Sequence, residues 1–150
     1  MEAESYSDPE IAEYISQNFI PLTFNIKQKG PVFHQYNVLW TPTVLLLDSE
    51  GRERYRSEGY LPRGEFFARL LAGEARLEFM QKRWSEAERI NKQIVERFPK
   101  STAVPEAMYW AGVVRYKSTN DHSGLAPLAS DLKVKYPESV WTKAASVWAG

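Results

Sequence analysis

The sequence predicts an α/β first half, with a small sheet of about three strands, followed by an all-α array of helical hairpins. Up to about Pro62, apolar residues form short runs at strand spacing between helical turns, and after Pro62 they recur only at helical spacing. Within the second half, the tetrapeptide Phe-Pro-Lys-Ser at 98–101 recurs as Tyr-Pro-Glu-Ser at 136–139. This recurrence indicates an internal repeat of helical units.

The first element is a helix that begins at residues 7–10. Ser7 and Asp8 are capping residues, Pro9 suits the first turn, and Glu10 lies at the positive end of the helix dipole. Residues 19–26 then alternate in hydrophobicity, which predicts a strand that ends at the loop 27–30.

A hairpin is predicted next, after one or two helical turns at 31–36. Residues 43–47 form a continuous apolar run, which is typical of a central strand covered on both faces. The turn residues 48–51 follow, and the polar segment 53–57 is expected to pair with the apolar run in antiparallel fashion.

Everything after Pro62 is predicted to be helical, because the remaining apolar residues follow helical stripes. Five stripes are present: Phe66, Leu70 and Leu71; Ala87, Ile90, Ile94 and Phe98; Ala107, Trp110, Ala111 and Val114; Leu125, Leu128, Leu132 and Tyr136; and Trp141, Ala144, Ala145 and Trp148.

Charge and hydropathy exclude several classes of partner. Nineteen basic side chains balance nineteen acidic ones, so we expect no nucleic-acid partner and no membrane partner. The longest apolar run is too short to span a bilayer, and the amino terminus lacks the pattern of a secretory signal. The sequence as written predicts a cytoplasmic protein, and a missing amino-terminal segment would allow a periplasmic or exported one.

The residues needed for most catalytic chemistry are scarce. The chain has no cysteine, which removes disulfides, thiolate nucleophiles and zinc–thiolate sites together. Of its two histidines, His34 is interpreted as structural or solvated and His122 as part of a polar turn. No glycine-rich phosphate loop or activated serine motif occurs. We therefore expect no catalytic residue, no metal site and no cofactor.

Five stretches, at 7–12, 18–22, 40–43, 48–51 and 59–60, occur in a specific order and spacing. In this order and spacing, residues 1–71 resemble a thioredoxin-like domain. The resemblance implies that Thr41–Pro42 is the cis-proline loop that contacts the backbone of bound substrate, and that Trp40 lies at the edge of that groove. Trp40, Thr41 and Pro42 are therefore the predicted binding residues.

The departure from that family is as informative as the match. The family places a Cys-x-x-Cys motif shortly before a segment like residues 1–6, and its opening strand and cysteines have no counterpart here. Either the protein is a shortened relative or the sequence starts too late. In that family the opening strand lies between the strand that matches 19–26 and the strand that matches 43–47. Because the opening strand is absent here, we expect these two strands to pair directly or the chain to associate with a second copy.

Residues 72–150 resemble tetratricopeptide repeats more loosely. Residues 84–87 match the start of a second repeat helix and Pro99 matches a closing proline, whereas Glu74, Glu78 and Asn91 depart from the usual residue types. Such arrays bind peptides or partner domains on their concave surface, so the resemblance implies interaction.

Together these patterns predict a non-catalytic protein-binding or scaffold module that binds a protein or peptide and forms a dimer. The alternative is that the chain is the C-terminal part of a thiol–disulfide oxidoreductase whose Cys-x-x-Cys segment is missing. The aromatic residues, 13% of the chain, are interpreted first as core and second as a partner surface.

Overall fold

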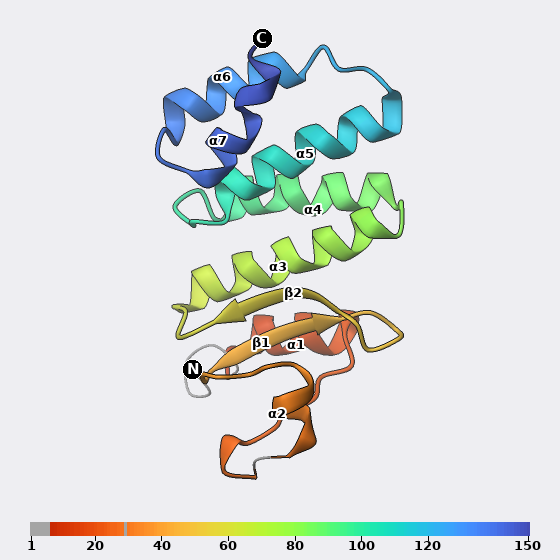
Figure 1. Cartoon of the computed structure of the whole chain (residues 1–150), viewed down its shortest axis with the longest axis vertical. Coiled ribbons are helices and arrows are strands. Elements are labelled where there is room, and N and C mark those ends of the chain that lie inside the picture. The colour runs from red at the N-terminus through yellow and green to blue at the C-terminus, as the bar shows by residue number, and fades with distance from the viewer. Residues whose placement is uncertain (1–6, 29) are drawn as a thin grey trace. The chain divides into compact units, whose positions relative to one another are not determined.

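The computed structural model describes residues 7–28 and 30–150 (Figure 1), so the resemblance at residues 1–6 lies outside it. The chain divides into two compact units, Met1–Phe67 and Ala68–Gly150. Helix α3 (Arg63–Met80) runs across this division, and the domain boundary expected after residue 71 also lies within α3. No helix in the described ranges is both long and apolar enough to cross a membrane.

The first unit starts with helix α1 (Pro9–Asn18), which is capped as its sequence predicts. The Asp8 carboxylate accepts hydrogen bonds from the backbone N–H groups of Glu10 and Ile11, each at 3.1 Å. The same carboxylate pairs with the guanidinium of Arg63 at the start of α3. Ile11 is fully buried, and the Phe67 ring of α3 packs edge-on against Tyr14, with 5.1 Å between the ring centroids.

The predicted hairpin is confirmed. Strands β1 (Thr43–Leu47) and β2 (Glu53–Glu58) pair in antiparallel fashion, with a register shift between Leu46 and Leu47. The turn is organised by Asp48, whose Oδ1 accepts the backbone N–H groups of Glu50 at 2.9 Å and Arg52 at 3.0 Å. Its Oδ2 accepts from the side chains of Arg52 and Arg54. The two oxygens of one carboxylate thus hold the turn and the first residues of β2 together.

Arg56 of β2 links the hairpin to the short helix α2 (Pro31–Gln35), which follows the 3₁₀ turn η2 (Ile26–Gln28). Its guanidinium donates to the carbonyl of Tyr36 and pairs with Glu53 at 2.7 Å and Glu58 at 2.9 Å. The Tyr36 hydroxyl in turn donates to the carbonyl of Gly51 at 2.8 Å. These contacts attach the segment around α2 to the hairpin turn and to the middle of β2.

The prediction of a strand at 19–26 is wrong. The described residues contain a two-stranded sheet rather than a sheet of about three strands. A strand needs a hydrogen-bonded neighbour, and no described segment pairs with residues 19–25. Pro21 also lacks the backbone N–H that a ladder requires. The side chains that would have formed the buried face are exposed instead: Ile20 by 90%, Leu22 by 73%, Phe24 by 52% and Ile26 by 45%.

The second unit is entirely helical over the described residues, as predicted. After α3 come α4 (Trp84–Arg97), α5 (Val104–Thr119), α6 (Leu125–Lys135), α7 (Val140–Ala145) and the 3₁₀ turn η3 (Ser146–Trp148). Helix α4 packs on α5, α5 packs on α6, and α7 contacts both α5 and α6. Successive helices therefore lie beside their neighbours in sequence, as in an array of hairpins.

The repeated tetrapeptide adopts the same geometry twice. Phe98 and Tyr136 end α4 and α6 with closely similar backbone angles, φ −125° and ψ 53° against φ −138° and ψ 58°. In each copy the serine N–H donates to the carbonyl of the aromatic residue, at 2.9 Å for Ser101 and 3.1 Å for Ser139. The 98–101 and 136–139 turns therefore redirect the chain in the same way.

Helix α6 lies close to α5 at Gly112. A Cβ atom at this position would lie 2.3 Å from Cδ2 of Leu128. Beyond this contact, Ala129, Leu132 and Ala145 form a buried cluster. The absence of a side chain at position 112 thus lets Leu128 of α6 pack directly on α5.

We predict that Gly112→Leu lowers the free energy of unfolding by about 1 to 3 kcal/mol, because the added side chain overpacks the contact with Leu128. The matched control is Gly124→Leu, since a Cβ atom at Gly124 meets nothing within 4 Å. The control should change the free energy of unfolding by less than about 0.5 kcal/mol. Chemical denaturation followed by far-ultraviolet circular dichroism measures both, and equal effects of the two substitutions would contradict the packing described here.

A second prediction concerns acid sensitivity of the hairpin. The backbone N–H of Arg52 and the side chains of Arg54 and Arg52 hold the pKa of Asp48 well below its usual range. The ionised carboxylate therefore stabilises the folded hairpin above the unfolded-state pKa of about 4, and this stabilisation is lost as pH falls toward the folded-state pKa. In Asp48→Asn this source of acid sensitivity is absent.

Hydrogen exchange of the β1 and β2 amides between about pH 3 and pH 6 measures this effect, after correction for the intrinsic exchange rate. Protection should fall with pH in the wild type and change less in Asp48→Asn. Asp131→Asn, on the exposed side of α6, should behave like the wild type. The same acid dependence in Asp48→Asn and in the wild type would show that Asp48 does not organise the turn.

Candidate functional site

The predicted binding residues lie together in the loop before β1. The Thr41–Pro42 peptide bond is cis. The Thr43 hydroxyl donates to the carbonyl of Trp40 at 2.7 Å, and the backbone N–H of Gly59 donates to the carbonyl of Pro42 at 2.8 Å. The loop is therefore fixed on one side by the first residue of β1 and on the other by the residue that follows β2.

This loop carries an exposed apolar surface. Leu39 is 89% exposed and Trp40 is 68% exposed. Because Gly59 is bonded to Pro42, Tyr60 leaves the hairpin at the same end, and its side chain is 52% exposed. We call Leu39, Trp40 and Tyr60 the loop surface. A tryptophan this exposed, next to other large apolar side chains, is typical of contact surfaces for protein partners.

The loop surface is suited to binding rather than to acid–base chemistry. Trp40, Thr41 and Pro42 carry no group that titrates near neutral pH. His34 is exposed on α2, and no group of three potential metal-binding side chains occurs among residues 7–28 and 30–150. The loop can contact a ligand through apolar surface, an indole N–H and backbone polar groups.

The helical unit contains a second feature, a connected cluster of six half-buried aromatic side chains. Its ring centroids are separated by 5.4 Å for Phe79–Trp84, 5.1 Å for Phe79–Trp110, 5.4 Å for Tyr109–Trp110, 5.2 Å for Tyr109–Trp141, 4.7 Å for Tyr109–Trp148 and 6.1 Å for Trp110–Trp141. Each of the six side chains keeps part of its surface open to solvent. We call this set the aromatic cluster.

A charged side chain lies within the aromatic cluster. The Arg76 guanidinium stacks over the ring of Trp110, 3.8 Å from its centroid, and lies 5.6 Å from that of Phe79. Its Nη1 atom is shielded from solvent, and no described residue accepts a hydrogen bond from it. Burial lowers the pKa of this guanidinium, while nearby Glu106 opposes the shift. An arginine nonetheless stays charged at any physiological pH.

Glu106 is shared between two arginines. Its Oε2 lies 3.1 Å from Nη1 of Arg69. The Nη2 atom of Arg69 donates to the Thr102 hydroxyl at 2.6 Å. Burial raises the pKa of Glu106, and the charges of Arg69 and Arg76 lower it. This arrangement could not be predicted from the sequence, because Arg76 of α3 and Trp110 of α5 come together only in the folded chain. The one available signal was the spacing of Arg76 and Phe79 on one helical face.

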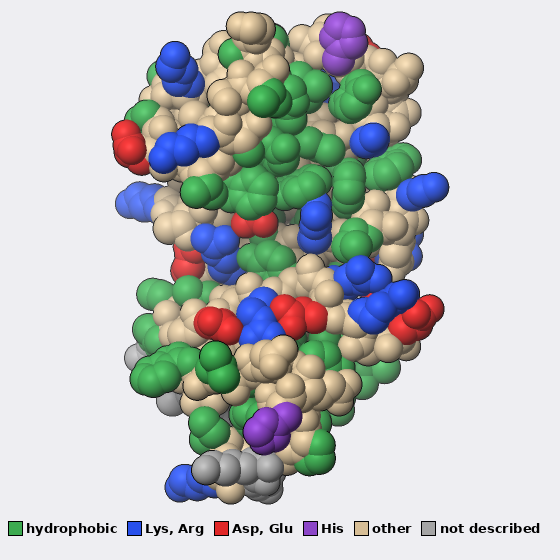
Figure 2. All heavy atoms as spheres, viewed as in Figure 1, with side chains coloured by type: hydrophobic (Ala, Val, Ile, Leu, Met, Phe, Trp, Pro, Cys, Tyr) green, Lys and Arg blue, Asp and Glu red, His purple; other side chains and the backbone are tan. Residues whose placement is uncertain are grey.

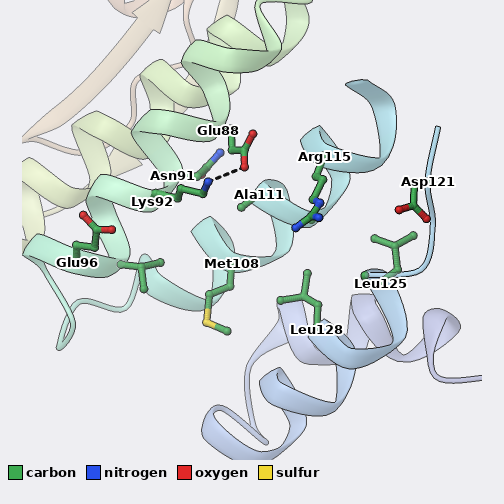
Figure 3. Close-up of a pocket in the computed structure, with 13 residues that line it drawn as sticks. Glu88, Asn91, Lys92, Glu96, Met108, Ala111, Arg115, Asp121, Leu125 and Leu128 are labelled. Atoms are coloured by element: carbon green, nitrogen blue, oxygen red, sulfur yellow. Dashed lines mark ion pairs between the residues drawn. The ribbon is translucent and has the colours of Figure 1, made fainter. Parts of the chain in front are cut away.

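A hollow of about 310 Å³ lies between α4, α5 and the start of α6 (Figure 3). Its apolar lining includes Met108, Leu125 and Leu128, and its charged lining is of both signs. Lys92 there is paired with Glu88 at 2.7 Å. This mixture of charges favours no single class of ligand.

Comparison with known proteins identifies the first half of the chain. The matching family is the thioredoxin-like domain, and the match covers residues 1–74. No curated protein and no solved structure matches the chain. The matched range includes α1, the hairpin and the loop surface, which are the elements expected from the resemblance. The chain therefore carries a thioredoxin-like domain over residues 1–74.

Proposed function

We propose that the chain is a non-catalytic protein-binding module, and that its thioredoxin-like domain binds a partner through exposed apolar side chains. One observation carries the proposal: large apolar residues of the first unit that would be buried in a complete sheet or groove are open to solvent. These are Ile20, Leu22, Phe24, Ile26, Leu39, Trp40 and Tyr60. Soluble monomers rarely expose so many large apolar side chains close together in sequence.

The loop surface supplies the specific part of this binding site. In the proposal, Trp40 stacks on an apolar side chain of the partner while backbone groups of Thr41 and Pro42 lie next to the partner's main chain. The rigid attachment of the loop to Thr43 and Gly59 supports this role, since a pre-formed loop loses little conformational entropy on binding.

The helical unit supplies a second interaction surface in this proposal, as a tetratricopeptide-like array. Support comes from the pairing of successive helices and from the repeated turns at 98–101 and 136–139. Glu78 and Asn91, which depart from the usual repeat residues, are accommodated by polar contacts. Glu78 pairs with Arg83, and the Asn91 amide donates to the carbonyl of Ala87 at 2.8 Å.

We further propose that one partner is a second copy of the chain. Among residues 7–28 and 30–150, β1 pairs with β2 on one edge and with no strand on the other, so alternate N–H and C=O groups of β1 point away from the sheet. A two-stranded hairpin by itself is marginally stable in water. Association of two copies would pair the open edge and cover the apolar segment 19–26, most simply across a twofold axis.

We expect light scattering at micromolar concentration to give the mass of a dimer. The double substitution Leu22→Ser/Phe24→Ser removes two exposed apolar side chains of the segment 19–26 and should shift the protein toward the monomer. The control Val134→Ser removes a side chain that is 81% exposed on α6, and it should leave the dimer intact. A wild-type monomer at all concentrations would contradict self-association and leave binding of a different partner to be tested through Trp40.

A second candidate function is favoured by the match to the thioredoxin-like domain. In this alternative the chain is the C-terminal part of a thiol–disulfide oxidoreductase whose cysteines lie in a segment outside this sequence. A coding sequence upstream of Met1 that encodes a strand and a Cys-x-x-Cys motif would favour the oxidoreductase. A stop codon there would favour the binding module.

For the chain itself we predict no disulfide reductase or isomerase activity, because exchange requires a thiolate and the sequence contains no cysteine. The measurement is dithiothreitol-coupled reduction of a protein disulfide, compared with the buffer blank. Turnover above the blank that increases with protein concentration would refute this prediction.

A further inference from the structure

We propose that the C-terminal end of the helical unit is a docking surface for an amphipathic helix of a partner protein. The surface is formed by the last turn of α6 and by η3, and the partner helix carries leucines at the spacing found in α6. This inference rests on the proposed function of the helical unit as an interaction surface. It names the part of the array that binds and the kind of structure that it binds.

The C-terminal end of the helical unit exposes valines. Figure 2 shows hydrophobic side chains at the surface of this unit. Among the large apolar side chains that are mostly open to solvent, Val134 of α6, Val140 of α7 and Val147 of η3 are exposed by 81%, 68% and 79%. The terminal repeats of helical arrays need a polar outer face to stay soluble. Exposed valines at this end therefore indicate a contact surface rather than a cap.

The internal repeat is longer than the two turns and ends at this surface. Residues 98–112 and 136–150 align without a gap, and both copies end in Trp-Ala-Gly. In each copy the serine hydroxyl accepts the backbone N–H two residues later, at 3.0 Å in the first and 3.2 Å in the second. The alanine six residues after this serine, Ala107 or Ala145, is fully buried in both. The chain from α7 to η3 thus repeats the first half of α5.

In the first copy this part of α5 is covered by α6. A Cβ atom at Gly112 would lie 2.3 Å from Cδ2 of Leu128. Met108 and Tyr109 pack against the buried cluster to which α6 contributes two residues. All three α5 residues are therefore half-buried.

In the second copy the corresponding residues are uncovered. Ser146, Val147 and Gly150 take the places of the three α5 residues, and all of them are exposed. The last turn of α6 shows the same difference. Glu96 of α4 lines the hollow between α4, α5 and the start of α6, whereas Val134, 38 positions later, is open to solvent. In the described part of the chain, no helix takes the place that α6 has in the first copy.

The α5–α6 contact indicates the chemistry of the missing helix. Leu125, Leu128 and Leu132 of α6 are spaced i, i+3 and i+7, which places them on one face of the helix. Leu125 and Leu128 both lie within 4 Å of a Cβ atom built on Gly112. A partner helix with the same spacing sets a leucine against Gly150 and its other leucines against the exposed valines. The partner helix thereby continues the packing of the array by one helix.

The first test is a nuclear magnetic resonance titration of the full chain with an acetylated and amidated peptide of residues 121–137, which contains the sequence of α6. The indole N–H of Trp148 is the reporter. We expect a saturable shift with a dissociation constant of about 1 mM or tighter. The affinity is limited because so short a helix is marginal in isolation and has to form on binding. The peptide with Leu128→Asp should bind at least about tenfold more weakly, since its carboxylate would face apolar surface.

Variants of the full chain locate the site. Val147→Asp should weaken peptide binding at least about tenfold. The matched control is Val140→Asp, which adds the same charge to α7 at the position that corresponds to Thr102, an exposed residue of the first copy. The control should leave binding unchanged. Light scattering of Val147→Asp should give the wild-type mass, which distinguishes loss of this site from loss of the association proposed for β1 and the segment 19–26.

A tethered helix tests the surface independently of peptide affinity. Repeating residues 113–137 after Gly150 places a copy of α6 where the internal repeat predicts it, at a high effective concentration. We expect the amides of α7 and η3 to exchange at least about tenfold more slowly than in an extension that carries Leu125→Asp and Leu128→Asp in the added copy only. Equal exchange in the two extensions would overturn the docking surface. Docking of the tethered helix without binding of the free peptide up to about 1 mM would overturn the claim that a separate protein supplies the helix.

Discussion

The first unit depends on one constraint: in the part of the chain that the structure describes, β1 has a hydrogen-bonded neighbour strand on one side only. A hairpin of this size gains little from its own ladder, so its stability has to come from contacts beyond it. The Asp48 carboxylate accepts hydrogen bonds within the turn, and the Arg56 guanidinium donates to the segment around α2. Asp8 and Tyr14 contact the first residues of α3. These contacts hold the hairpin, but they leave the second edge of β1 open and the segment 19–26 exposed.

The helical unit satisfies its backbone in a different way. Each helix completes its own hydrogen bonds, and contacts between neighbours in sequence bury the apolar stripes, as in other repeat proteins. Such a scaffold can carry polar groups without losing its fold. Arg76 beside Trp110, and Glu106 shared by two arginines, are charged groups of this kind that lie partly buried within the helical unit.

The sequence predicted what depends on local spacing. The helical stripes predicted α3 to α7, and the apolar run 43–47 with its polar turn predicted the hairpin. Each of these patterns lies within the element that it predicts, so no distant residue is needed to recognise it. The segment 19–26 shows the limit of local patterns. Its alternating hydrophobicity predicted a strand, but a strand forms only when another segment of the chain pairs with it. The loop residues Trp40, Thr41 and Pro42 could be proposed from a family resemblance. The contact between Arg76 and Trp110 could not, because these residues are 34 positions apart in the sequence and lie on different helices.

We propose that the exposed apolar residues of the thioredoxin-like domain bind protein. Hydrogen–deuterium exchange of the full chain, measured at low and at high protein concentration, tests this most directly for a second copy as the partner. We expect the amides of β1 and of the segment 19–26 to become more protected as the protein concentration rises, while those of α4 and α5 do not change. Protection in β1 and 19–26 that is independent of concentration would contradict the claim that a second copy covers them.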